Sequence, residues 1–145
     1  MKALIQRVKS ASVIIDKNTI CSINEGFLIL LGVAKTDIPQ DVKSLVKKII
    51  NLRIFPNENK GMHKSLKDVQ GSALIVSQFT LYGNCNKGRR PSFTNAAKSE
   101  LAKPLYLDFI NKMKQNKIDV QSGIFGSDMD ICIVNNGPVT IMLES

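Results

Sequence analysis

Along the first quarter of the chain, apolar and polar residues follow patterns that are typical of β-strands. Alternation with a period of two predicts a strand over residues 2–15, and the polar residues 16–18 predict a turn into a returning strand over residues 19–24. The run over residues 27–34 is almost continuously apolar, which indicates a strand that is buried on both faces. The N-terminal part of the chain is therefore expected to be β-structure.

Two later segments have the apolar spacing of amphipathic helices. In the first, apolar residues recur every three or four positions as far as Ile50, after a start signal in which Asp37 caps the helix and Pro39 lies in its first turn. Its lysines fall outside the apolar stripe, which indicates a solvated face. The second helix is expected over residues 104–117.

The segments around these helices complete a mixed pattern. Residues 55–71 are polar and contain several Asn and Gly residues, which indicates a long loop. A strand is expected over residues 72–79, and further strands around Val120, over residues 131–134 and over residues 139–143. Helices and strands without internal repeats indicate an α+β fold.

Length and charge narrow the class of protein. A chain of 145 residues is long enough to bury its own core, and we expect a single domain over residues 1–145. Twenty Lys and Arg against twelve Asp and Glu give a net charge of +8, which favours a polyanionic partner, although a generally lysine-rich composition accounts for it equally well.

The cysteines and the single histidine argue against a metal site. Cys21, Cys85 and Cys132 are dispersed, odd in number and form no C-x-x-C pair, which is typical of a reduced intracellular protein. With His63 as the one imidazole, neither a zinc site nor any other cofactor is expected. The N-terminus does not read as a signal peptide, and the longest apolar run, residues 27–31, is too short to span a bilayer. These features predict a cytoplasmic protein without a membrane partner.

A first candidate site lies where a buried strand ends, at Ser77, Gln78, Phe79 and Thr80. Hydroxyl and amide side chains at a strand end can face a pocket, and the backbone N–H groups of Phe79 and Thr80 are candidates to bind an oxyanion. In isolation, however, such hydroxyls more often satisfy local backbone groups. A hydroxyl nucleophile needs a base, and His63 alone in a polar loop makes a catalytic triad improbable.

The dipeptide Gly137-Pro138 is a second candidate. It separates two β-like runs near the C-terminus, so the motif alone favours a hairpin turn. The alternative is that it presents carbonyl oxygens to another molecule, because Gly has no side chain and Pro has no N–H.

Seven segments along the chain resemble those of D-aminoacyl-tRNA deacylases of the DTD family, and together they span essentially its whole length. They are MKALIQRV (1–8), LGV (31–33), NLRIF (51–55), SQFTLY (77–82), KGRRPSF (87–93), GIFGSDM (123–129) and NNGPVT (135–140). The resemblance implies the DTD-like fold, in which two main helices pack on a mostly antiparallel, barrel-like sheet. It also implies a homodimer.

The resemblance further implies a hydrolase that cleaves the ester between a D-amino acid and the 3′ end of tRNA, and that also removes glycine from mischarged tRNA. Ser77 to Thr80 would build one wall of the pocket, and the partner subunit would supply Gly137-Pro138 with a cis peptide bond. Such a motif would proofread chirality by excluding L-amino acids. Arg7 matches an arginine that supports this loop, and Phe125 and Met129 match residues that line the site near the terminal adenosine.

Two points stay open at this stage. The basic segment after the pocket strand is expected to contact tRNA phosphates through Lys87, Arg89 and Arg90. Two alternative functions stay open for the protein: a basic RNA-binding module without catalysis, and a small-molecule deaminase or hydrolase. Thr80 is a candidate nucleophile in the family. We favour a role in shaping the pocket, with assistance from the 2′-hydroxyl of the tRNA, because no residue is evident that could deprotonate Thr80.

Overall fold

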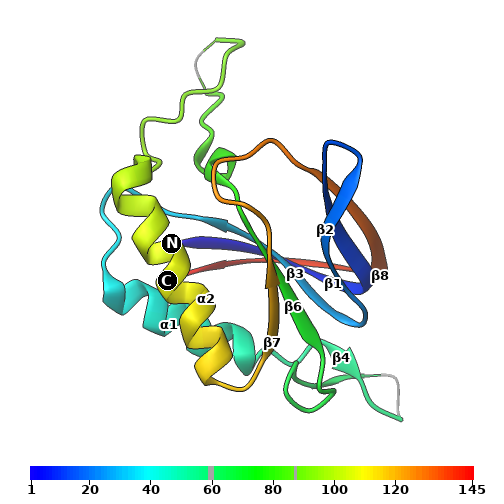
Figure 1. Cartoon of the computed structure of the whole chain (residues 1–145). Coiled ribbons are helices and arrows are strands. Elements are labelled where there is room, and N and C mark those ends of the chain that lie inside the picture. Colours follow the sequence, from blue (N-terminus) through cyan, green and yellow to red (C-terminus); the bar gives the residue numbers. More distant parts are fainter. Residues whose placement is uncertain (59–60, 87) are drawn as a thin grey trace.

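The structure is a computed structural model that describes residues 1–58, 61–86 and 88–145 (Figure 1). In chain order its elements are β1 (Lys2–Ile15), β2 (Asn18–Ile23), β3 (Gly26–Gly32), α1 (Pro39–Ile50), β4 (Phe55–Pro56), β5 (Met62–Lys64), β6 (Ser72–Ser77), the 3₁₀ helix η1 (Phe79–Tyr82), α2 (Ser99–Gln115), β7 (Asp119–Ser122) and β8 (Asp130–Glu144).

The main sheet is mixed, strongly curved and barrel-like. Its strand order is β2-β1-β3-β6-β7, and β8 pairs with β1 beside this path. Strand β1 is antiparallel to β2, β3 and β8, whereas β3, β6 and β7 run parallel to one another. The parallel pairs arise because α1 lies between β3 and β6, and α2 between β6 and β7, as crossover connections. The two ends of the sheet approach each other where the Cys21 thiol on β2 lies 3.3 Å from the Ser122 carbonyl oxygen on β7. The α+β architecture with two main helices is confirmed.

Two apolar cores fill the two faces of this sheet. The larger core lies between the sheet and the helices, and it includes Phe27 and Ile29 of β3 together with Leu45 and Phe109 of the helices. The smaller core fills the concave side and includes Leu28 of β3, which comes between Phe27 and Ile29 in the sequence. Because adjacent residues of β3 are buried on opposite faces, its sequence is continuously apolar, as predicted.

The start of α1 differs from the expected cap. Ile38, not Asp37, is the N-cap residue, and Pro39 is the first helical residue. The carboxylate of Asp41 accepts a hydrogen bond of 3.0 Å from the Ile38 N–H, and this bond lowers the pKa of Asp41. The acidic cap is therefore supplied from within the first turn rather than from the residue before it.

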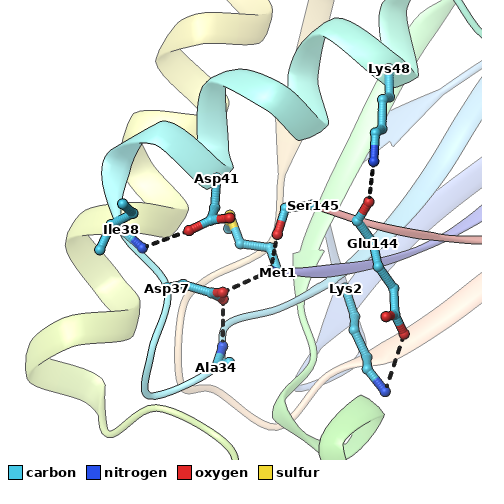
Figure 2. A network of polar contacts seen from close by, with 9 residues as sticks. All are labelled: Met1, Lys2, Ala34, Asp37, Ile38, Asp41, Lys48, Glu144 and Ser145. Carbon is cyan, nitrogen blue, oxygen red and sulfur yellow. Dashed lines mark hydrogen bonds and ion pairs between the residues drawn. The ribbon is translucent and has the colours of Figure 1, made fainter.

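Asp37 is instead buried and binds the amino group of Met1, which in turn contacts Ser145 (Figure 2). Its Oδ1 lies 2.8 Å from the ammonium group of Met1, and its Oδ2 accepts a 2.6 Å hydrogen bond from the Ala34 N–H. The Met1 ammonium also donates to Ser145 Oγ at 2.6 Å. A buried carboxylate is tolerated here because both of its oxygens have partners.

The second helix begins earlier than predicted, at Ser99, and Pro104 lies inside it. The helix tolerates this proline because its ring is exposed and the carbonyl that it leaves without an N–H partner can bond to water. Ala102 and Leu105 continue the buried stripe toward the N-terminus, so packing on the core extends the helix past the proline. Residues 55–71 also contain more structure than a loop, because β4 and β5 pair as a short hairpin.

Gly137-Pro138 does not form a hairpin turn. Strand β8 keeps one direction and pairs with β1 on both sides of the dipeptide, with Asn135 opposite Val8 and Thr140 opposite Gln6. Four residues of β8, 136–139, thus face a single residue of β1 and bulge out of the ladder. The Gly137-Pro138 peptide bond is cis.

Neither helix has the character of a membrane span. α1 has 12 residues and α2 has 17, and in the residues that the structure describes no helix is both long and apolar enough to cross a bilayer. Within the same residues, no three His, Cys, Asp or Glu side chains are grouped as metal ligands.

One buried hydroxyl joins α2 to the sheet. Tyr106 is 2% exposed, and its hydroxyl donates a 2.9 Å hydrogen bond to the Ile75 carbonyl oxygen on β6. The same oxygen accepts the Gly123 N–H at 3.1 Å, just after β7. The Tyr106 ring packs against Phe125 with centroids 5.5 Å apart, and burial raises the pKa of Tyr106 to about 12. Helix, strand and the segment after β7 thus meet at one carbonyl group.

We expect Tyr106→Phe to lower the free energy of unfolding by about 1 kcal/mol, the usual contribution of one buried hydrogen bond. Urea denaturation measures this change. Tyr82→Phe is the matched control, because among the described residues the half-buried Tyr82 hydroxyl donates to no backbone carbonyl. Equal losses in the two variants would contradict the importance of the Tyr106 bond.

Candidate active site

A cleft of about 430 Å³ opens at the edge of the sheet where the parallel strands end. Strands β3, β6 and β7 present their carboxyl ends at this edge, which is where α/β sheets commonly bind ligands. The lining residues are Leu31, Val33, Val76, Ser77, Gln78, Phe79, Ala97, Ser99, Ala102, Tyr106, Phe125, Gly126, Ser127, Asp128, Met129 and Ile131. Segments far apart in sequence therefore share one pocket.

Three of the four candidate catalytic residues, Ser77, Gln78 and Phe79, line this cleft. The Gln78 N–H donates to the Leu31 carbonyl oxygen at 2.8 Å, so the chain stays paired with β3 before it turns into η1. Phe79 is 56% exposed at the rim, and its ring packs edge-on against Phe93 with centroids 5.0 Å apart. The strand end thus delivers one hydroxyl, one amide and one aromatic ring to the same wall.

The backbone N–H groups of Phe79 and Thr80 have no partner within the described part of the protein. They are the first two N–H groups of η1, and the geometry of a helix start leaves such donors unsatisfied. Thr80 itself is exposed and does not line the cleft. Its Oγ1 accepts a short hydrogen bond from Gln78 Nε2, so its own proton is directed elsewhere. His63 lies on β5, in the hairpin at the opposite end of the molecule from η1 (Figure 1).

The segment after β7 supplies the opposite wall. Phe125 and Met129 both line the cleft, and Gly126 between them has a φ of +81°, a conformation that favours glycine. Phe125 is held by its contact with Tyr106. Asp128 is the one lining residue with a charged side chain.

Sequence reasoning missed part of this site. Ser99, Ala102 and Tyr106 are spaced to share one face of α2, but the expected start of that helix at residue 104 placed the first two outside it. With the helix start known, this spacing would have identified the α2 wall.

Gly137 and Pro138 do not line the cleft of their own chain. They lie in the β8 bulge above Arg7, whose side chain is buried. Arg7 Nε donates to the Asn136 carbonyl oxygen at 3.1 Å, and its Nη1 donates to the Ile54 carbonyl oxygen. The Arg7 guanidinium group therefore connects the β8 bulge to the segment before β4.

The basic segment lies beyond η1. Arg89 and Arg90 are exposed, while Lys87 lies outside the described residues. Asn84 and Ser92 exchange backbone hydrogen bonds of 2.8 and 2.9 Å, which closes a loop that extends away from the body of the molecule (Figure 1). Both arginines are accessible to a large anionic partner.

Comparisons with known proteins agree with this architecture. A family model described as D-Tyr-tRNA(Tyr) deacylase matches residues 4–144. Two proteins named D-aminoacyl-tRNA deacylase, from Clostridium novyi (strain NT) and Thermosipho africanus (strain TCF52B), are 54% and 52% identical over 145 residues, which cover 100% of this chain and 97% of each relative.

Solved structures are also similar. One named "c-Myc DNA Unwinding Element Binding Protein" is 40% identical, has a TM-score of 0.94 and is matched over 100% of this chain and 99% of its own. A second, "Structural Analysis of a probable eukaryotic D-amino acid tRNA deacylase", is 17% identical with a TM-score of 0.84 over 99% of this chain and 98% of its own, which shows the same fold. On the strength of the family model and the two relatives that match its full length, this chain belongs to the D-aminoacyl-tRNA deacylase family, a family of hydrolases.

Proposed function

We propose that this protein hydrolyses the ester bond between a D-amino acid and the 3′ end of tRNA and releases both. The observation that carries the proposal is the pair of unpartnered N–H groups at the start of η1, that of Phe79, which lines the cleft, and that of Thr80, the next residue. Two consecutive backbone donors at a strand end are suited to bind the negative oxygen that develops when an ester carbonyl is attacked.

The chemistry needs little more than this. Water attacks the carbonyl carbon, the bond to the ribose oxygen breaks, and that oxygen leaves with a proton. An aminoacyl ester is already reactive, and the neighbouring 2′-hydroxyl of the ribose can assist proton transfer, so positioning and oxyanion binding supply the acceleration. Thr80 does not act as the nucleophile in this proposal, because its hydroxyl contacts Gln78, which is not a base. It shapes the pocket only through Gln78, which lines the cleft.

Thr80→Ala should lower kcat/KM for D-tyrosyl-tRNA by less than about tenfold, because the variant keeps the backbone N–H and loses only the hydroxyl. Single-turnover deacylation with purified enzyme provides the measurement. Complete loss of turnover with substrate still bound would instead make Thr80 the nucleophile.

Chiral selection is proposed to come from a second copy of the chain. Gly137 and Pro138 are absent from their own cleft, but they bulge from β8, which lies at one side of the sheet. The same strand exposes Ile133 (39%), Val134 (52%) and Met142 (45%), and exposed apolar side chains on one strand suit a contact between subunits. In a homodimer, the bulge of one subunit would reach the cleft of the other.

Main-chain carbonyl groups in that position would separate D from L by exclusion. The side chain of an L-amino acid would collide with them, whereas that of a D-amino acid would point away. Steric rejection of this kind can exceed the ~1–3 kcal/mol that a methylene-sized contact provides. Glycine has no side chain to reject, so glycyl-tRNA is expected to be a substrate as well.

Gly137→Ala tests this account. A Cβ at position 137 would lie 2.9 Å from Arg7 Nη2 and 2.8 Å from Val139 Cγ2, and the φ of +127° is strained for any L side chain, so the loop must shift. We expect the D/L ratio of kcat/KM for tyrosyl-tRNA to fall about tenfold or more, a change of ~1.4 kcal/mol. Glycyl-tRNA is the matched control substrate because no side chain meets the loop. An unchanged D/L ratio would refute the steric account.

The exposed arginines are proposed to bind the tRNA backbone. Arg89→Ala combined with Arg90→Ala should weaken tRNA binding and make the slope of log K against log salt shallower by about 1–2, because two phosphate contacts are lost. The D/L ratio should not change. Lys43→Ala with Lys47→Ala, on the exposed face of α1, is the charge-matched control. A salt slope that is the same in both double variants would exclude the arginines from the tRNA contact.

Nucleic acid binding without catalysis is the second candidate. It is favoured only by the name of the 40%-identical structure, which refers to a DNA element. Release of free D-tyrosine from D-tyrosyl-tRNA, compared with L-tyrosyl-tRNA, separates the two functions.

A further inference from the structure

We propose that a second pocket, next to the catalytic cleft, binds the nucleotide that precedes the terminal adenosine of tRNA, which is a cytidine in every CCA end. The inference rests on the proposed function. The pocket has a volume of about 270 Å³ and is lined by Lys2, Leu81, Tyr82, Gly83, Asn84, Cys85, Asn86 and Asn95. Pockets for drug-sized ligands span roughly 300–1,000 Å³, so this one suits a single nucleoside.

The pocket and the cleft share two walls. In η1, Phe79 lines the cleft, whereas Tyr82 lines the pocket. In the segment that leads to α2, Ala97 lines the cleft, whereas Asn95 lines the pocket. The two cavities therefore border the same two segments, and the proposal places the preceding nucleotide in the pocket when the terminal adenosine occupies the cleft.

The shared segment is fixed in place. The Lys35 N–H donates to the Asn95 carbonyl oxygen at 3.2 Å, and the Ala97 N–H donates to the Val33 carbonyl oxygen at 2.9 Å. The first bond uses the backbone of Asn95, which is exposed and lines the pocket, and it leaves the side-chain amide of that residue available. A held backbone with an accessible amide is a suitable arrangement for reading a base edge.

The lining chemistry is that of a pyrimidine site. An asparagine amide offers both donors and an acceptor, which complement the amino group, ring nitrogen and carbonyl oxygen of cytosine. Asn84 Oδ1 is already occupied, because it accepts the Asn86 N–H at 2.9 Å. Among the described hydrogen bonds, the side-chain amides of Asn86 and Asn95 make none, so both can pair with a base.

Lys2 brings a positive charge to the same pocket. Its ammonium lies 5.1 Å from the centroid of the Tyr82 ring, within cation–π range, and 3.4 Å from Glu144 Oε1 (Figure 2). Glu144 is exposed, so water weakens this ion pair and leaves the ammonium able to attract the phosphate that links the two nucleotides. Aromatic ring, amides and cation together match the general requirements for a single-stranded nucleotide.

Binding of the unacylated dinucleotide CpA and of its abasic analogue rpA, which lacks the cytosine base, tests the pocket directly, by calorimetry or fluorescence. We expect the wild-type protein to bind CpA about tenfold more tightly than rpA, as two hydrogen bonds to a base edge would provide. Asn95→Ala and Asn86→Ala should each reduce this ratio toward one. Asn111→Ala, an exposed asparagine of α2, is the matched control and should preserve it.

Equal affinity of the wild-type protein for CpA and rpA would overturn the proposal, as would a preference for CpA that survives both pocket variants. Hydrolysis of D-tyrosyl-CpA, measured in parallel, reports on the proposed function. A protein that prefers CpA through Asn86 and Asn95 but releases no D-tyrosine would refute the hydrolase and retain the pocket.

Discussion

The structure depends most on the pairing of β1 with β8. Strand β1 forms ladders with three other strands, and β8 follows it from Lys2 to Ile14 with two interruptions, a wide bulge opposite Arg7 and a smaller register shift at Lys9. At Arg7 the buried guanidinium donates to the carbonyl oxygen of Asn136, which the bulge takes out of the ladder, and to that of Ile54, which precedes β4. The ladder on both sides fixes the ends of the bulge, and Arg7 fixes its middle. A loop with a glycine in it thereby acquires one defined position at the side of the sheet.

A second constraint acts at the opposite edge. The carboxyl ends of the parallel strands would form only a shallow rim without the contacts that bring α2 and the segment after β7 against them. The Ile75 carbonyl oxygen provides that link, since it accepts from both Tyr106 and Gly123. Because Phe125 packs on the Tyr106 ring, the depth of the cleft and the orientation of its far wall depend on the same helix. The cleft is thus a consequence of packing in the larger core.

Much of the fold could be predicted from local patterns, and the errors have a common cause. The period of two over residues 2–15 and the apolar stripe ending at Ile50 are complete within their own segments, so both elements were predicted correctly. The start of α2 was predicted at residue 104 rather than at Ser99, because burial of the turn before Pro104, which extends the helix, is a tertiary effect. The dipeptide Gly137-Pro138 taken alone favoured a hairpin turn, which the structure does not form. Both flanks pair with β1 instead, and no local signal reports this pairing because it joins residues about 130 positions apart. Likewise Ser77 to Phe79 could be placed at a pocket, while the α2 wall could not.

The distribution of charge separates affinity from selectivity. The cleft carries a single charged side chain, Asp128, whereas Arg89, Arg90 and Lys2 lie outside it. On the proposed function, phosphate contacts stabilise D- and L-aminoacyl-tRNA equally, in the ground state and in the transition state, so they cannot contribute to chiral selection. Selection must then come from neutral surfaces close to the α-carbon, where position rather than charge discriminates. A rigid main-chain loop supplies such a surface without the rotamer freedom of a side chain, and this is why its support by Arg7 matters for function as well as for stability.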